Sequence, residues 1–162
     1  DKVLAEEGFD SLSDYLQEAQ ILSQMELEAE TLEQEITSCR EQTEELERRY
    51  GELEEKVDAV ETGSSACVLF EQGLSTVDVR KLADKLAQKV LFAAVFNGSD
   101  TDGYQYVICA SDRDVSAFGK AFNKALCGRG GGKNPMIQGQ VKAEQKAIWE
   151  YLTKGGVLQD GK

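Results

Sequence analysis

The sequence of 162 residues contains no histidine. The chain therefore lacks the imidazole group that serves as general base, metal ligand or proton switch near neutral pH. Four cysteines are present, but they form no C-x-x-C pair, and no histidine is available to complete a zinc site with them: Cys39, Cys67, Cys109 and Cys127. We expect reduced, buried thiols, no metal, no cofactor and no catalytic activity in this chain itself.

Long apolar runs are also missing. The longest is the seven residues of Val90–Phe96, far short of the ~20 needed to cross a bilayer. The sequence therefore predicts a soluble, cytoplasmic protein without a membrane segment. Its first residues, Asp1–Leu4, include no initiator methionine and no signal-peptide layout, so we expect a piece of a longer chain. The length suits one ordinary domain, or a small domain with an extended element.

The net charge of -12 is divided unevenly along the chain. Residues 1–62 hold 20 acidic and five basic side chains, whereas residues 63–162 hold 10 acidic and 13 basic ones. Glycine shifts at the same place, since only Gly8 and Gly51 of the 15 glycines precede residue 62. The turn-forming residues 63–65 follow directly. We therefore predict two parts, an acidic one over 1–62 and a globular one over 63–162.

The acidic part carries a heptad pattern. Apolar residues alternate at spacings of three and four over about five heptads, which is typical of a coiled-coil helix. The seam predicted for dimerisation includes Met25, Leu32, Ile36, Leu46, Leu53 and Val57. Because a long polar helix cannot bury such a seam alone, its partner is either a second copy of the chain or a helix that precedes this sequence. A solvated spacer helix is the simpler alternative.

The globular part alternates between strand and helix patterns. Strands are predicted over 66–70, 90–96 and 104–110, the last two forming a hairpin. Helices are predicted to start after Ser75, after Ser111-Asp112 and at Asn134-Pro135, the last of them through Ile137, Val141, Ile148 and Leu152. The order β-α-β-β-α-loop-α indicates a small α/β (α+β) domain with a sheet of three or more strands and packed helices, preceded by the coiled-coil stem.

The hairpin loop contains Asp100 and Asp102, which are acidic residues at alternate positions. Such oxygen ligands occur in calcium loops, but the further carboxylates of a calcium site are missing. We therefore interpret them as a solvated hairpin tip.

The strongest chemical pattern is the glycine-rich segment Gly128–Met136. Successive glycines allow backbone N–H groups to converge, and Asn134 before Pro135 is typical of the start of a helix. A glycine loop that leads into a helix N-terminus forms an anion pocket, here beside Arg129 and Lys133. The alternative is that the glycines end one helix and turn tightly into the next.

Basic residues gather around this segment. The segment from Arg113 to Lys146 contains seven basic and two acidic side chains. Each basic side chain can neutralise one phosphate of a polyanion. Ordinary solubilising lysines are the alternative. The residues predicted to bind RNA or another anion are Arg129, Gly130, Gly131, Gly132, Lys133, Asn134, Gln138, Lys120, Lys124 and Lys142.

The segment Gly130–Gly139 has the sequence GGGKNPMIQG and follows a strand-loop-strand and a capped helix. It resembles the signature of the DHH-associated domain, found in alanyl-tRNA synthetases, alanyl-tRNA editing proteins and DHH phosphoesterases. The resemblance covers residues 66–152, and the helical stem before it matches the alanyl-tRNA group. Synthetases usually have Arg-Pro-Asp after the glycines and phosphoesterases a histidine, and Lys133 stands there in this chain. The resemblance implies a non-catalytic module that contacts tRNA, most naturally alanine tRNA, and forms a homodimer.

Two other functions remain open at this point. One is the substrate-binding half of a DHH-type phosphoesterase, in which Lys133 and the glycines would hold the phosphates of an oligonucleotide or cyclic dinucleotide. The other is a purely structural coiled-coil oligomerisation module. The resemblance favours the alanyl-tRNA group, as a free-standing editing protein or a synthetase-related chain.

Overall fold

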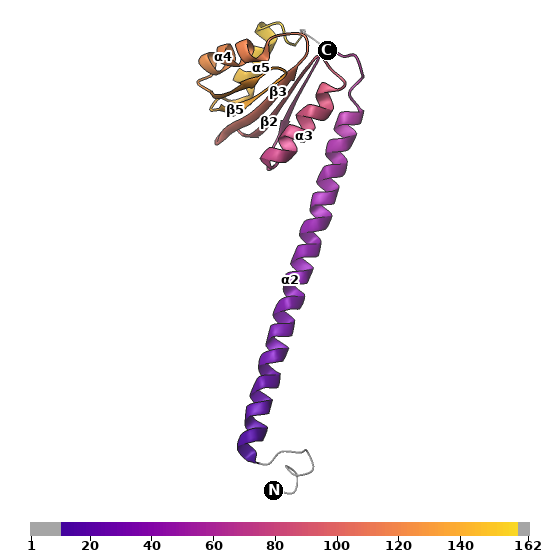
Figure 1. The fold of residues 1–162 in the computed structure, drawn as a ribbon, viewed down its shortest axis with the longest axis vertical. Coiled ribbons are helices and arrows are strands. Elements are labelled where there is room, and N and C mark those ends of the chain that lie inside the picture. The colour runs from indigo at the N-terminus through magenta and orange to yellow at the C-terminus, as the bar shows by residue number, and fades with distance from the viewer. Residues whose placement is uncertain (1–10, 159–162) are drawn as a thin grey trace. The chain divides into compact units, whose positions relative to one another are not determined.

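The structure is a computed structural model that describes residues 11–158. Its centre is a five-stranded mixed sheet with the order β1-β2-β3-β5-β4 (Figure 1). The strands are β1 (Ala66–Glu71), β2 (Phe92–Ser99), β3 (Gly103–Ala110), β4 (Arg129–Lys133) and β5 (Met136–Val141), and the helices are α2 (Leu12–Asp58), α3 (Thr76–Ala87), α4 (Val115–Ala125) and α5 (Gln145–Lys154). β1 is parallel to β2, and the other neighbouring strands are antiparallel. The predicted α+β class with a preceding long helix is confirmed.

The predicted long helix is α2, which has 47 residues. Ser11 begins it by accepting a hydrogen bond from the backbone N–H of Asp14, at 3.2 Å. Gly51 lies inside the helix and does not end it. The chain divides within α2 into two compact units, which meet between Gly51 and Glu52. None of the helices formed by residues 11–158 combines the length and the apolar character that a membrane crossing requires.

The sheet belongs to the second unit, and its central strands β2 and β3 are covered on both faces (Figure 1). Alternate residues of a strand point to opposite faces. Phe92 and Phe96 of β2 pack with Phe122 of α4 and with Ile148 of α5, in one core cluster. Ala93 and Val95 point the other way and pack with α3 in a second cluster. β2 is therefore a central strand buried on both sides, as its unbroken apolar run predicts.

The helix starts test the capping predictions. Ser75 is the N-cap of α3 and accepts from the N–H of Asp78, so that prediction is confirmed. The cap of α4 is Asp114, whose carboxylate accepts from the N–H groups of Ser116 and Ala117, so the prediction of Ser111-Asp112 is wrong. Asp112 instead bonds to the guanidinium of Arg113, and this ion pair holds the pKa of the Asp112 carboxyl below its ordinary value.

The prediction of a helix from Asn134 is also wrong. Residues 129–133 and 136–141 form the antiparallel strands β4 and β5, joined by a tight turn at Asn134-Pro135. Within β5, Ile137 and Val141 are buried while Gln138 and Gln140 are exposed. This alternation is the pattern of a strand, although the spacing of Ile137 and Val141 also fits a helix face. Helix α5 begins only at Gln145, and the predicted inward residues Ile148 and Leu152 are buried on it.

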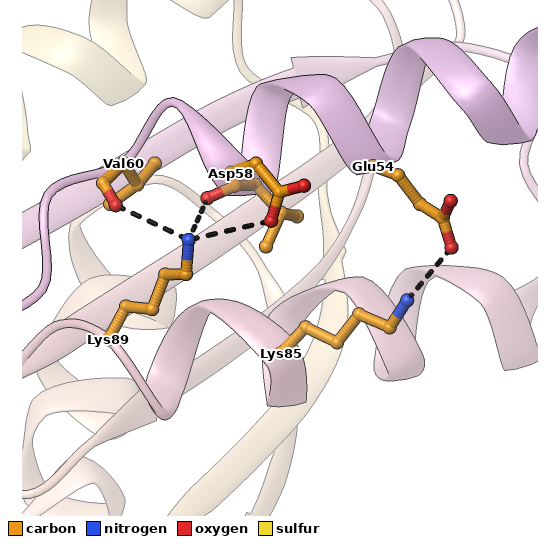
Figure 2. A network of polar contacts seen from close by, with 6 residues as sticks. Glu54, Asp58, Val60, Lys85 and Lys89 are labelled. Atoms are coloured by element: carbon orange, nitrogen blue, oxygen red, sulfur yellow. Dashed lines mark hydrogen bonds and ion pairs between the residues drawn. The ribbon is translucent and has the colours of Figure 1, made fainter.

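The last turns of α2 belong to the second unit and pack on α3. Val57 is buried in the cluster beneath α3, and Leu53 packs against the same cluster. The ammonium of Lys89 donates to the carbonyl oxygen of Val57 at 2.7 Å and lies 3.7 Å from Asp58 (Figure 2). A cation at the last carbonyls of a helix also interacts favourably with the helix dipole. Of the six predicted seam residues, Leu53 and Val57 therefore contact their own globular unit.

The cysteines do not share one environment. Cys109 is buried and Cys67 half-buried, whereas Cys39 and Cys127 are exposed, so the prediction of buried thiols is wrong for these last two. Burial, with the nearby carboxylate of Asp84, raises the pKa of the Cys109 thiol to about 11.

Candidate nucleic-acid interface

The glycine-rich segment is an edge strand. β4 has the sequence RGGGK, pairs on one side with β5, and is exposed at all five residues. The next element is the strand β5 rather than a helix, and the side chain of Asn134 does not cap α5, which begins at Gln145. Its Oδ1 instead accepts from the backbone N–H of Val115, 2.8 Å away at the start of α4. The predicted anion pocket at a helix N-terminus is therefore wrong.

Along β4, the backbone N–H and C=O groups of successive residues point alternately toward β5 and toward the outer edge of the sheet. The N–H of Ala110, at the end of β3, donates to the carbonyl of Pro135 at 3.1 Å. The backbone of Pro135, just before β5, therefore bonds toward β3. In an antiparallel sheet the next residue along β5 must then bond to the other neighbour. Gly131, opposite Gln138, accordingly directs its N–H and C=O toward β5. Gly130 and Gly132 direct theirs toward the outer edge, where the Gly130 carbonyl accepts from Asn123 Nδ2 at 3.5 Å.

Two of the three glycines in β4 are required by packing. A Cβ on Gly130 would lie 2.8 Å from the Tyr106 hydroxyl, and one on Gly132 would lie 3.0 Å from the Cα of Ile137. Gly130 also has a φ of +156°, which side-chain-bearing residues rarely adopt. At Gly131, by contrast, an added Cβ would meet nothing within 4 Å. Packing therefore does not account for the glycine at position 131.

Gly131 lies on an uncovered part of the sheet that we name the open sheet face. α3 packs on β2 and β3, and on the same side of β5 Met136 packs against that cluster, whereas Gln138 and Gln140 of β5 and the residues of β4 are exposed. Cross-strand neighbours share a face, so Arg129 lies beside Gln140 and Gly131 beside Gln138. The open sheet face consists of exposed residues only: Arg129, Gly131, Lys133, Gln138 and Gln140.

The open sheet face combines two kinds of polar group. Arg129 and Lys133 lie at the two ends of β4 and carry positive charge. Gln138 and Gln140 offer amide donors and acceptors between them. None of the five residues is acidic. Such a surface is flat, cationic at its margins and able to hydrogen-bond with a polar polymer lying across it.

The structure separates the other predicted binding residues from this face. Lys120 and Lys124 lie on α4, which covers the opposite face of the sheet. Lys142 follows the end of β5, whereas Lys133 pairs with Met136 at its beginning. These two ends of the strand are about 20 Å apart at ~3.4 Å per residue. Of the residues predicted from sequence, Arg129, Gly131, Lys133 and Gln138 share a face.

One residue of the open sheet face, Gln140, is absent from the sequence-based prediction. The signal for it is the alternation of the segment IQGQV, in which Ile137, Gly139 and Val141 occupy one face and the two glutamines the other. A prediction of strand rather than helix there would have included Gln140.

A second polar cluster lies where the β2–β3 turn meets the start of α5. The Glu144 side chain makes no capping bond, and the N–H of Gln145 donates instead to Asp100 Oδ1 at 2.7 Å. The hydroxyl of Tyr104 donates to the same oxygen at 2.8 Å. These two bonds lower the pKa of Asp100, and burial with the nearby carboxylate raises the pKa of Tyr104 to about 12. Asp100 therefore has a structural role at the helix start.

Within residues 11–158, no group of three His, Cys, Asp or Glu side chains could hold a metal ion.

Comparison with solved structures reveals a likeness, whereas comparison by sequence does not. No family model and no curated protein matches the sequence. Among solved structures, the chain is similar to the C-Ala domain of alanyl-tRNA synthetase from Aquifex aeolicus, with a TM-score of 0.49 and 22% sequence identity. The similarity covers 57% of this chain and 92% of that chain.

Proposed function

We propose that the second unit is a non-catalytic RNA-binding module whose ligand is tRNA, and that the open sheet face contacts the RNA. The observation that carries this proposal is a flat, uncovered part of the sheet in which a glycine without a packing role lies between two cations. The resemblance of the GGGKNPMIQG segment to the alanyl-tRNA group supports alanine tRNA within this class. The parent chain would then be a cytoplasmic alanyl-tRNA editing or synthetase-related protein.

The chemistry of the face suits a folded RNA. Arg129 and Lys133 can each neutralise a backbone phosphate, which makes the affinity depend on salt. The glutamine amides can hydrogen-bond to ribose hydroxyls and base edges in the wide, shallow minor groove of an RNA helix. Gly131 has no side chain to keep the RNA away from the strand. This mode of contact responds chiefly to the shape of the RNA and only weakly to its sequence.

We also propose that the first unit dimerises two copies of the chain. The heptad residues before Gly51 are exposed, with Met25 at 59%, Leu32 at 57% and Ile36 at 51% of their maximal exposure. A helix with such a continuous apolar seam is stabilised mainly by packing against another helix. Because Leu53 and Val57 pack on the second unit, the seam available to a partner ends near Tyr50.

The RNA proposal is tested by titrating the full chain with tRNA, a short oligonucleotide and a cyclic dinucleotide, each at low and moderate salt. We expect preference for tRNA and weaker binding at the higher salt. Tight binding of the cyclic dinucleotide alone would favour the phosphoesterase function, and no binding of any ligand would favour a purely structural module.

Site variants locate the contact. We expect Lys133→Ala and Arg129→Ala each to lower tRNA affinity about threefold to tenfold, and Gly131→Val to lower it further because the branched side chain blocks close approach. The matched control is Lys154→Ala, which removes the same charge from the end of α5. If Gly131→Val and Lys133→Ala bind tRNA like the wild type while their circular dichroism is unchanged, the open sheet face is not the RNA site.

A further inference from the structure

The exposed seam of α2 raises the question of how its partner is oriented. We propose that the partner is a second copy of this chain in antiparallel orientation, with Ile36 facing Cys39 of the partner subunit. This inference rests on the homodimer proposed above and adds its orientation and register. It follows from the sizes of the seam residues, from their charges and from the contacts that end the seam.

The seam residues have complementary sizes when the helices run in opposite directions. In an antiparallel pair each a position faces a d position of the partner. With Ile36 facing the partner's Cys39, Leu32 faces the partner's Thr43. Ala29 then faces the partner's Leu46, and Met25 faces the partner's Tyr50. Each of these layers contains at least one large apolar side chain, and three of them combine a large with a small one.

A parallel pair in register lacks this complementarity, because every residue then faces its own copy. Ala29 would face Ala29 of the partner subunit and leave a gap between the helices. Thr43 would face the partner's Thr43, so two hydroxyl groups would enter the seam. Tyr50 would face the partner's Tyr50. Gaps and unmatched volumes of this kind weaken a packed interface.

The charge distribution favours the same orientation. Within the paired span, residues 25–37 of α2 contain five acidic and no basic side chains, whereas residues 38–50 contain four acidic and three basic ones. A parallel dimer would hold the two strongly acidic segments side by side. An antiparallel dimer places each of them beside the segment that contains Arg40, Arg48 and Arg49. Like charges at short range destabilise an interface, so the antiparallel pair has the lower electrostatic cost.

One flanking pair distinguishes the orientations. Glu33 and Arg40 both occupy e positions, which neighbour each other across an antiparallel seam. Glu33 then lies beside Arg40 of the partner subunit, and the pair occurs twice in the dimer. In a parallel dimer the neighbour of an e position is a g position, and Glu33 would lie beside the partner's Glu28.

The extent of the seam agrees with this register. The eight seam residues from Met25 to Tyr50 pair only among themselves. The preceding a position, the exposed Leu22, is opposite the partner's Leu53, which packs on its own second unit, so the seam contact ends there. A register shifted by one heptad toward the C-terminus would require Leu53 and Val57, which pack on the second unit. The same shift toward the N-terminus would leave Tyr50 without a seam residue opposite it.

The orientation is tested by disulfide cross-linking of the full chain. The background carries Cys39→Ser and Cys127→Ser, which removes the two exposed thiols. Met25→Cys and Tyr50→Cys are introduced into separate preparations with different affinity tags, which are then mixed and oxidised in a glutathione buffer. We expect a cross-link between the two different chains and none between identical ones. A cross-link of the Met25→Cys chain to itself would overturn the inference.

Sedimentation equilibrium separates this inference from the homodimer on which it rests. A monomer at high concentration would overturn both. A dimer whose cross-links are parallel would overturn the antiparallel orientation alone.

A charge reversal provides a second measurement. In the antiparallel dimer Glu33→Arg places two cations together, and we expect the dimer dissociation constant to rise about fivefold. Glu33→Arg with Arg40→Glu restores the pair and the affinity. The control Glu30→Arg makes the same charge change at an outward b position and should not weaken the dimer. A tighter dimer with Glu33→Arg than with Glu30→Arg would indicate the parallel pair and overturn the inference.

Discussion

The hydroxyl of Tyr106 donates a hydrogen bond of 2.9 Å to Oδ1 of Asn123, in space that two glycines leave open. Cβ atoms on Gly130 and Gly139 would lie 2.8 and 2.7 Å from that hydroxyl. The tyrosine ring is buried in the core between the sheet and α4. The glycines of adjacent strands therefore allow β4 and β5 to lie over a buried tyrosine whose polar end is hydrogen-bonded.

This arrangement predicts different costs for the glycines. Gly139→Ala should destabilise the fold by about 2–4 kcal/mol, because the new methyl group collides with backbone as well as with Tyr106. Gly131→Ala should change the free energy of unfolding by less than about 0.5 kcal/mol, since its Cβ enters open space. Urea unfolding followed by circular dichroism measures both. Equal costs at the two positions would mean that the strands are not packed as described.

The contact between the end of α2 and α3 makes a second prediction. Val57 is 7% exposed, and we expect Val57→Ala to cost about 1–2.5 kcal/mol of stability by loss of burial and a cavity beneath α3. Lys89→Met removes the bond to the Val57 carbonyl while retaining most of the aliphatic part of the side chain, and should cost about 1 kcal/mol. Chemical denaturation measures both effects.

Val60→Ala is the matched control for this contact. Val60 is only partly buried at the edge of the same cluster, so the same change in side chain should cost less than Val57→Ala. Lys85→Met, which removes an exposed ion pair with Glu54 in the neighbouring turn, should cost less than Lys89→Met (Figure 2). If all four variants unfold like the wild type, the last turns of α2 are not part of the second unit's core.

Asp100 makes a prediction about pH. Bonds from the Gln145 N–H and the Tyr104 hydroxyl lower its pKa from the ordinary value of 3.8. A carboxyl whose pKa is lower in the folded state stabilises the fold above its unfolded pKa, and this stabilisation disappears as the pH falls through the folded pKa. The wild type should therefore lose stability relative to Asp100→Asn as the pH is lowered from about 5 to below 3.

The measurement is urea unfolding of both proteins at several pH values. Asp102→Asn is the control, because the bonds of Asp102 to other described residues stay within the turn, with Ser99. A difference between wild type and Asp100→Asn that does not change with pH would contradict the role of the Asp100 carboxylate at the start of α5.

Local patterns predicted most of the elements correctly. The long helix α2, the cap at Ser75 and the buried run of β2 each depend on residues close together in the sequence, and the structure confirms them. The prediction of a helix in the segment after Cys127 is wrong for a specific reason. Asn134-Pro135 and the spacing of Ile137 and Val141 fit a helix start as well as a hairpin, and the local sequence does not distinguish them.

The contacts that local patterns do not predict join residues far apart in the sequence. Asn134 bonds to Val115, which is 19 residues earlier, and Gln145 bonds to Asp100, 45 residues earlier. A cap supplied by a remote element leaves no signal beside the helix that it begins. The same holds for Leu53 and Val57, which continue the heptad pattern but pack on α3.

The order of residues alone determined that this chain has a long acidic helix with an apolar seam and a separate, glycine-rich sheet domain with a small positive charge. It did so because periodicity, caps and charge are local properties. Only the tertiary structure decided that the glycine segment is an edge strand, which of its cations share a face and where the seam ends. These features depend on strand pairing and burial. They are set by which distant segments bond to a given backbone group or pack against a given apolar side chain.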